Sequence, residues 1–168
     1  FVQNSASGEL LKSIGIYENV TVSGDTRFDS VIHTAEHFTE LPNSIKLFCN
    51  GHRVLVAGST WAEDEEEFVH FIKNNTRIKF IIAPHETAKS NIEEVQSRFP
   101  GCQLFSRLSE APAQAGNVLI IDNIGMLSRL YKYADITYVG GGFGDDGLHN
   151  ILEAAVYGKP VIFGPNYE

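Results

Sequence analysis

Short apolar runs alternate with helical patterns along most of this 168-residue chain, and this alternation constrains the fold most strongly. Runs such as VLVA, FIIA and ITYV are rich in β-branched residues and place apolar side chains at consecutive positions. Consecutive apolar positions are typical of parallel strands that are covered on both faces. The alternation therefore predicts an α/β domain, a Rossmann-like open parallel sheet with helices on both faces.

The same patterns place the individual elements. The expected strands are residues 20–23, 54–57, 79–83, 103–105, 118–121, 136–139 and 161–163. The expected helices are residues 26–37, 62–74, 86–98, 125–134 and 148–157. The helix at 62–74 begins with a run of acids, which suits the positive end of a helix dipole. Residues 41–52 are polar and contain Gly and Pro, so they are expected to form a surface loop.

Composition limits the classes of function. The formal net charge is −8, and an acidic chain repels nucleic-acid phosphates, so no nucleic-acid partner is expected. A small phosphorylated ligand remains compatible, because local amides and one or two cations can outweigh the overall field. Cys49 and Cys102 lack a CxxC spacing, which predicts neither a disulfide framework nor a zinc knuckle. No apolar run has the length of a membrane span and no signal peptide opens the chain, so a soluble piece is expected.

The two ends suggest a piece of a longer protein. The chain begins without Met and stops directly after a strand-like run. Residues 1–168 are therefore expected to form one domain that is truncated at both ends, with residues 1–19 as an entry segment from a preceding domain.

Polar junctions follow several of the expected strands, where open α/β sheets bind their ligands. In GDTRFD, Arg27 could meet an anion; alternatively Asp25 caps a helix whose surface carries Arg27 and Asp29. In the next junction Gly58 permits a tight turn, while Ser59 or Thr60 either caps the following helix or donates a hydroxyl to a phosphate. This junction lacks the spacing and the Lys of a P-loop, so it does not indicate ATP hydrolysis of that kind.

Two further junctions carry weaker signals. Pro84 makes the turn after FIIA rigid and exposes the imidazole of His85. A single His at such a position more often has a structural role than a ligand contact. Asp122 and Gly125 flank the expected start of a helix, and capping is the simpler interpretation of Asp122.

The segment GGGFGDDGLHNILE, residues 140–153, raises the sharpest question. Its glycines allow a close approach of the backbone to a phosphate, and Asn150 and Glu153 would share one face near a helix N-terminus. A carboxylate there could accept hydrogen bonds from ribose hydroxyls. The spacing is not that of a dinucleotide fingerprint, and His149 with Asp145 and Asp146 is a poor metal-ligand set, so no metal is expected. A flexible turn is the alternative.

Taken together, GDTRFD, AGSTW, APHE, DNIG and GGGF with GLHNILEAA resemble the nucleotide-binding half of the 3-deoxy-D-manno-octulosonic acid (Kdo) transferases. Each motif is weak alone, but their order from Gly24 to Pro165 is specific. The resemblance implies the C-terminal half of a GT-B glycosyltransferase, with CMP-Kdo as donor substrate and no further cofactor. It also implies inverting, metal-independent transfer to the lipid A precursor, at the cytoplasmic face of the bacterial inner membrane. The catalytic base would lie in an N-terminal domain that this chain lacks.

The resemblance also assigns roles to individual residues. Ser59 and Thr60 would lie near the donor phosphate or sugar, Pro84 and His85 would border the cytosine, and Asn150 would reach the phosphate. Glu153 would bind the ribose. The residues implied to line the nucleotide are Ile124, Gly125 and Met126, and those implied to approach the phosphate are Gly141 and Gly142.

The chain departs from the family pattern at several positions. His85 and Glu86 stand where the family often has Arg-His, which removes an expected cation. Met126 follows Gly125 where the family often has Glu, and Ala154 follows Glu153 where Pro is common. Two alternatives remain: a UDP-sugar glycosyltransferase or UDP-GlcNAc 2-epimerase-like GT-B domain, and a nucleotide-sensing domain without catalysis.

Overall fold

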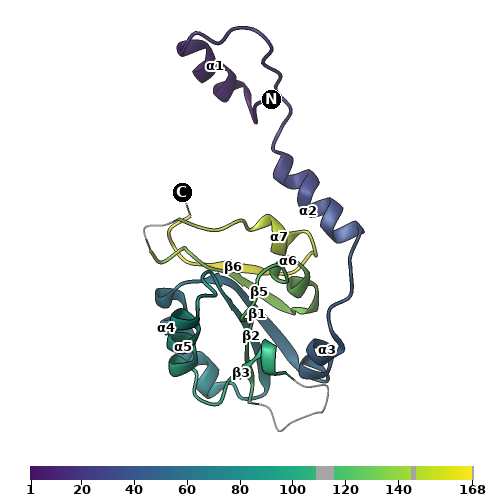
Figure 1. Ribbon diagram of the computed structural model, residues 1–168, viewed down its shortest axis with the longest axis vertical. Helices are drawn as coiled ribbons and strands as arrows, with labels where there is room; N and C mark the ends of the chain where they lie inside the picture. The colour runs from purple at the N-terminus through teal and green to yellow at the C-terminus, as the bar shows by residue number, and fades with distance from the viewer. Residues whose placement is uncertain (109–115, 145–146, 168) are drawn as a thin grey trace. The chain divides into compact units, whose positions relative to one another are not determined.

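The computed structural model describes residues 1–108, 116–144 and 147–167. The chain divides into two compact units, residues 1–37 and residues 38–168. Each unit has its own secondary structure, and the larger one contains the sheet (Figure 1).

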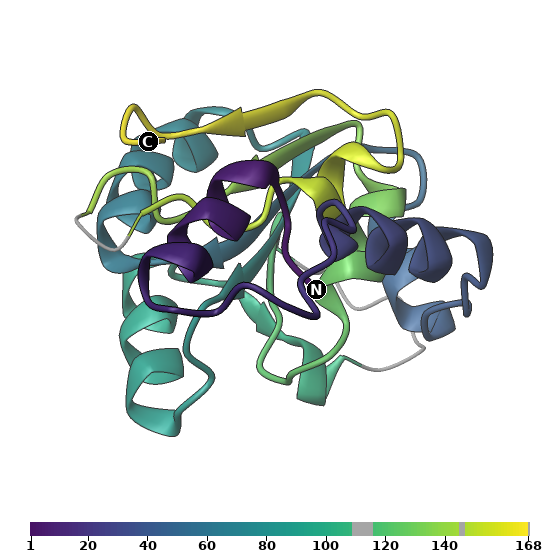
Figure 2. The same ribbon diagram turned by 90° about the horizontal axis from the view of Figure 1, so that it is seen from above.

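The larger unit is built on six parallel strands in the order β3-β4-β2-β1-β5-β6. The strands are β1 (Arg53–Thr60), β2 (Ile78–Pro84), β3 (Gln103–Leu104), β4 (Val118–Ile120), β5 (Ile136–Val139) and β6 (Val161–Phe163). Strand β6, yellow in Figure 2, forms one edge of the sheet. This open parallel sheet confirms the predicted Rossmann-like fold class.

Helices cover both faces of the sheet. Those of the larger unit are α3 (Asn43–Cys49), α4 (Ala62–Asn74), α5 (Lys89–Arg98), α6 (Leu127–Leu130) and α7 (Leu152–Ala155), with two 3₁₀ turns at Phe105–Arg107 and Tyr131–Tyr133. Helices α4 and α5 pack on one face of the sheet, and α3, α6 and α7 pack on the other (Figure 1).

Strand β2 shows how the sequence produces this double layer. Phe80 and Ile82 contribute to the core beneath α4 and α5, whereas Ile81 and Ala83 contribute to the core on the opposite face. Successive side chains of a strand point to opposite faces, so an unbroken apolar run is what two covered faces require.

The smaller unit contains α1 (Ser5–Ser13), α2 (Thr26–Glu36) and one parallel β-bridge between Val2 and Val22. Both helices begin at side-chain caps. The Asn4 side chain accepts a hydrogen bond from the Ser7 N–H at 2.9 Å, and the Asp25 carboxylate accepts one from the Arg27 N–H at 3.0 Å. None of the helices within the described residues is both long and apolar enough to cross a membrane.

Two sequence predictions are wrong here. Residues 20–23 form no sheet strand, because only Val22 pairs, and it pairs with Val2 alone. Residues 41–52 are not a surface loop: they contain α3, whose Ile45 and Phe48 are buried in the core together with Leu41. The spacing of four and three between these positions is that of a helix.

Other boundaries shift. The expected helix at 125–134 is a short α6 followed by a 3₁₀ turn, and the one at 148–157 is reduced to α7. Helix α1 lies in the segment expected to be an entry segment. The prediction for residues 62–74 matches α4 at both ends.

Candidate functional site

Three rings meet where strands β1, β2 and β5 end. Trp61 follows β1, His85 follows β2, and His149 lies in the segment after β5. The His85 ring stacks on Trp61 and on His149, with ring centroids 4.5 Å apart in each case. The indole Nε1–H of Trp61 donates a hydrogen bond to Nε2 of His149 at 3.1 Å. We call Trp61, His85 and His149 the ring cluster; sequence reasoning placed only His85 at a binding site.

Asp64, in the first turn of α4, contacts the ring cluster through the backbone of Trp61. It is 1% exposed. Its Oδ2 accepts hydrogen bonds from the backbone N–H of Trp61 at 2.9 Å and of Gly141 at 3.0 Å. Its Oδ1 accepts one from the Tyr138 hydroxyl at 2.5 Å, and burial together with this bond raises the pKa of Tyr138. The carboxylate thus ties the start of α4 to strand β5 and to the segment that follows it.

A second buried carboxylate, that of Glu65, accepts a hydrogen bond from the Thr60 hydroxyl. Thr60 Oγ1 donates to Glu65 Oε1 at 2.9 Å, and Arg98 Nη1 pairs with Glu65 Oε2 at 3.0 Å. Burial raises the pKa of Glu65, while Thr60 and Arg98 oppose that shift. Thr60 is 2% exposed, so its hydroxyl points inward, and Ser59 is the more accessible of the two.

Neither Ser59 nor Thr60 caps α4, so that interpretation is wrong. Trp61 is the N-cap residue, and Asp64 accepts its N–H. Because β1 continues to Thr60, both residues belong to the end of the strand. A role for either in holding the donor stays a prediction.

The glycines after β5 allow the chain to pack on itself. Gly140 donates its N–H to the Gly58 carbonyl at 2.9 Å, and its own carbonyl accepts the His149 N–H at 3.2 Å. A Cβ at Gly142 would lie 2.7 Å from the backbone nitrogen of Gly164, which leaves no room for a side chain. Gly141 has φ +93°, a conformation that favours glycine.

The Gly141 N–H is donated to Asp64. An approach of Gly141 to a phosphate stays a prediction. A close approach at Gly142 stays a prediction. Asp145 and Asp146, left without a role by the sequence, lie outside the described residues.

Asn150 and Glu153 do not share a helix, contrary to the prediction. Helix α7 begins at Leu152, and the Asn150 Oδ1 accepts the Leu152 N–H at 3.1 Å. Asn150 therefore caps the turn that leads into α7. Glu153 is half-buried, burial raises its pKa, and no hydrogen bond joins its carboxyl to any other described residue. Glu153 is the one carboxylate among the predicted ligand-binding residues, and it retains its capacity to accept hydrogen bonds from a ligand.

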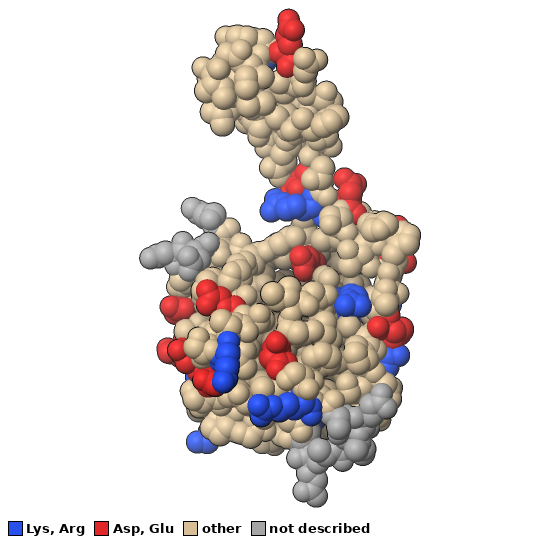
Figure 3. Space-filling model, viewed as in Figure 1, with Lys and Arg blue, Asp and Glu red and all other residues tan. Residues whose placement is uncertain are grey.

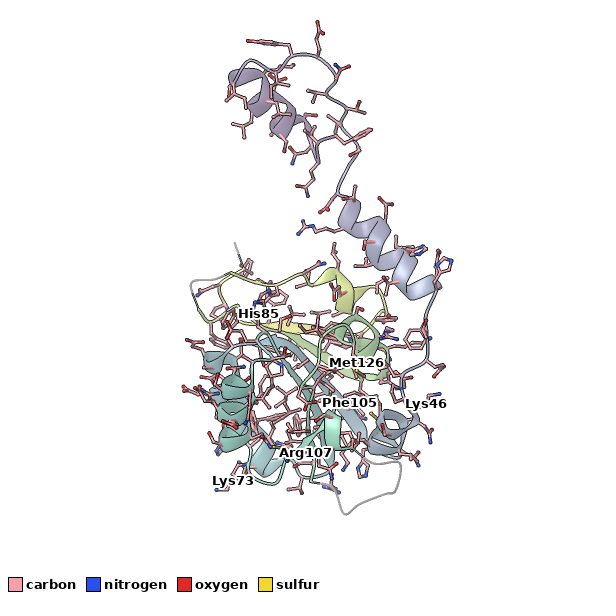
Figure 4. The ribbon with its side chains drawn as sticks, viewed as in Figure 1. Lys46, Lys73, His85, Phe105, Arg107 and Met126 are labelled. Atoms are coloured by element: carbon pink, nitrogen blue, oxygen red, sulfur yellow. The ribbon has the colours of Figure 1, made fainter. Side chains whose placement is uncertain are left out.

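The junction after β4 separates the residues predicted to line the nucleotide. Ile124 is 86% exposed, whereas Met126 is buried in the core, where its sulfur accepts a hydrogen bond from the Asn123 amide at 3.1 Å. Figure 4 labels Met126 near α6 and His85 near the ends of β1 and β2. The predicted cap at Asp122 is wrong, because its carboxylate accepts the N–H and the hydroxyl of Ser106.

A cavity of about 320 Å³, which sequence reasoning missed, lies between α5 and the ends of β3 and β4. It is lined by Thr87, Lys89, Ile92, Glu93, Gln96, Leu104, Ser106, Arg107 and Asp122. Lys89 and Arg107 are balanced by Glu93 and Asp122, so its charge is mixed. The only sequence signal was the position of Thr87 and Asp122 just beyond strand ends.

The basic side chains form no cluster on the face of the larger unit that Figure 3 draws. On the face of the larger unit seen in Figure 3, the Lys and Arg side chains stand apart from one another among Asp and Glu. In the smaller unit Asp25 caps α2, as the capping interpretation predicts, and Arg27 also pairs with Asp25 at 2.6 Å. Among the residues that the structure describes, no group of three His, Cys, Asp or Glu is arranged to hold a metal ion.

Comparison with known proteins relates this arrangement to one family. A 3-deoxy-D-manno-octulosonic acid transferase of Rickettsia typhi is 28% identical over 98% of the chain, and one of Aquifex aeolicus is 33% identical over 66% of it. The resemblance to Kdo transferases is confirmed. The chain spans 36% of the length of the Rickettsia relative and 31% of the Aquifex one. No protein-family model matches the chain.

Solved structures agree on the fold. The C-terminal CMP-Kdo binding domain of WaaA from Acinetobacter baumannii superposes with a TM-score of 0.63 at 21% identity, covering 83% of this chain and 72% of that one. Anabaena Alr3699/HepE, solved in complex with UDP-glucose, gives a TM-score of 0.51 at 13% identity over 98% of this chain and 44% of that one. Both solved structures therefore share the fold of this chain.

Proposed function

We propose that this chain is the donor-binding part of a glycosyltransferase that transfers Kdo from CMP-Kdo to the lipid A precursor in lipopolysaccharide synthesis. One observation carries the proposal: similarity to a Kdo transferase runs along 98% of the chain, and the motifs that carry the sequence resemblance lie at the ends of strands β1, β2, β4 and β5. Those strands end at the same edge of a parallel sheet, where such folds bind nucleotides.

The rest of the reaction belongs to other parts of the proposed enzyme. Inverting transfer needs a general base on the acceptor hydroxyl and stabilisation of the leaving phosphate. The base would come from an N-terminal acceptor domain, and the full-length protein would work at the cytoplasmic face of the inner membrane. The present chain would hold CMP-Kdo without a metal and would show no transfer alone.

Glu153 carries the most specific part of this proposal. Its carboxylate lies in α7 just after the glycine-rich segment and has no hydrogen bond to another described residue. Two ribose hydroxyls could donate to it, which would offset the cost of its burial. Ser59 would lie near the phosphate or the sugar, and Asn150 and Gly142 near the phosphate. Pro84 and His85 would border the cytosine, and Gly125 would line the nucleotide.

Calorimetric titration with CMP tests the assignment. Glu153→Ala is expected to weaken CMP binding about tenfold, equivalent to about 1.4 kcal/mol, through the lost ribose contact. Glu66→Ala, which removes an exposed acid of α4, is the matched control and should bind CMP like the parent chain. Equal affinities of the parent and Glu153→Ala would contradict the ribose role.

The similarity of the fold to that of HepE supports a second candidate function. That protein was solved with UDP-glucose, so a UDP-sugar glycosyltransferase or a UDP-GlcNAc 2-epimerase-like domain is the alternative. UDP binding well ahead of CMP would favour it. A nucleotide-sensing role would be favoured if CMP bound but a protein completed with its acceptor domain transferred no Kdo.

A further inference from the structure

We propose that Asp64, acting with Trp61, is a positioning residue that fixes the glycine-rich segment for nucleotide binding. Between β5 and the turn into α7, the described part of the segment comprises Gly140–Gly144 and Gly147–Asn150. The inference rests on the proposed function in one respect, the identity of the nucleotide, and otherwise on contacts within this chain.

Asp64 holds the beginning of the segment. Its Oδ2 receives the Gly141 N–H at 3.0 Å, and a Cβ at Gly140 would come within 2.7 Å of that same oxygen. The carboxylate therefore lies directly against the turn that begins where β5 ends. Its other oxygen takes the Tyr138 hydroxyl, which fixes its position relative to β5.

Trp61 holds the end of the segment. Its indole N–H bonds to the His149 ring, while the His149 backbone N–H returns to the Gly140 carbonyl. Asp64 in turn accepts the Trp61 backbone N–H, so one carboxylate supports both attachments. Asn150 follows His149 directly and caps the turn into α7, which carries Glu153. The position of Glu153 thus depends on contacts made by the first turn of α4.

The energetic reason for this arrangement is burial. A carboxylate that is 1% exposed is tolerated only when donors surround it, and here three donors do so. Removing it would leave the N–H groups of Trp61 and Gly141 without their partner in a water-poor environment. The segment would then rearrange to satisfy those groups, and Glu153 would move with it.

The test compares Asp64→Ala with Asp64→Asn. Asp64→Ala is expected to weaken CMP binding at least tenfold and to shift the amide NMR signals of Gly141 and His149. Asp64→Asn should stay within threefold of the parent, because its amide oxygen can accept both N–H groups while its NH₂ donates to the Tyr138 oxygen. Trp61 is the single tryptophan, so its fluorescence reports the same change in Asp64→Ala.

Glu65→Gln is the matched control. Glu65 is the neighbouring buried acid, but it bonds to Thr60 and Arg98 and to no described residue of the segment. It should lower the unfolding temperature and leave CMP affinity and the segment's amide signals unchanged. Equal loss of affinity in Glu65→Gln and Asp64→Ala would overturn the proposal, because it would indicate a general loss of stability.

Two further outcomes are decisive. If Asp64→Ala does not fold, Trp61→Phe takes its place: it keeps a stacking ring but lacks the N–H, so the His149 and Gly140 amide signals should shift and CMP affinity should fall. If the parent chain binds no CMP, the proposed function fails, and the ligand-free NMR comparison alone decides. Shifts that extend beyond the direct neighbours of residue 64 to His149 and Asn150 would support the positioning role, and unchanged signals of Gly141 and His149 would overturn it.

Discussion

The two units of this chain stabilise their helices in different ways. In residues 1–37 both helices have N-terminal side-chain caps, from Asn4 and Asp25, yet Gly8 and Val31 are the buried residues of those helices. In residues 38–168 no side-chain hydrogen bond caps α3, α5 or α6, but each contributes buried residues to a sheet-based core. Local signals thus define the helices of the smaller unit, whereas tertiary burial defines these three helices of the larger one.

Exposed apolar side chains sharpen the contrast. Leu10, Ile14, Tyr17 and Phe28 of the smaller unit are each more than half exposed, whereas Ile81 and Leu119 of the larger unit are fully buried. Burial of apolar surface is the dominant favourable term in folding. The larger unit should therefore carry most of the folding free energy.

The largest expected effect is a core truncation. Ile81→Ala or Leu119→Ala should lower the free energy of unfolding by about 2–5 kcal/mol, because each removes fully buried methyl groups and leaves a cavity. Ile14→Ala, at a position 69% exposed, should change it by about 0.5 kcal/mol or less. Urea unfolding measures both, and comparable losses at the two positions would contradict the contrast.

Two glycine substitutions should change stability in opposite directions. Gly142→Ala should destabilise the larger unit by about 1–3 kcal/mol, because the added Cβ meets the backbone of Gly164. Gly8→Ala should stabilise α1 by up to about 1 kcal/mol, because no atom lies within 4 Å of the added Cβ and alanine favours a helix. Hydrogen exchange of the two units would reveal each change separately, and a shared sign would contradict the assignment.

The smallest expected effect is a pH dependence confined to the smaller unit. The Arg27 side chain beside Asp25 lowers the pKa of that carboxyl from 3.8 to about 2. A lowered pKa contributes stability above 3.8 that is lost as the pH falls through about 2. Amide protection at the start of α2 should therefore decrease over that interval, and Asp25→Asn should abolish the dependence. An unchanged profile in Asp25→Asn would assign the dependence to other groups.

The sequence predicted best what depends on local pattern. Strands β1, β2, β5 and β6 and helix α4 were predicted because apolar periodicity and acids in a first turn are readable without tertiary context. Helix α3 was missed because it is short and because the Pro, Asn and Ser residues at its start are typical of loops. The strand at 20–23 was wrong because a β-branched run forms a sheet only where partners are available.

The site was predictable as a set of junctions but not as a set of contacts. Parallel strands bring their carboxyl ends together, so His85 and the segment after β5 could be placed at one edge. Asp64 was hidden in an acidic run that suited the helix dipole. Its spacing of four from Phe68 and of eight from Ile72 places it on the buried face of α4, and that was the available signal. The hydrogen bond from Trp61 to His149 joins positions far apart in the sequence, so no local sequence pattern could indicate it.

The most direct test of the account is a competitive calorimetric titration of the chain with CMP-Kdo, CMP and UDP. CMP-Kdo and CMP should bind and compete with each other, and UDP should bind more weakly. Glu153→Ala should lower the affinity for both cytidine ligands about tenfold. Preferential binding of UDP, or an affinity for CMP that Glu153→Ala leaves unchanged, would contradict it.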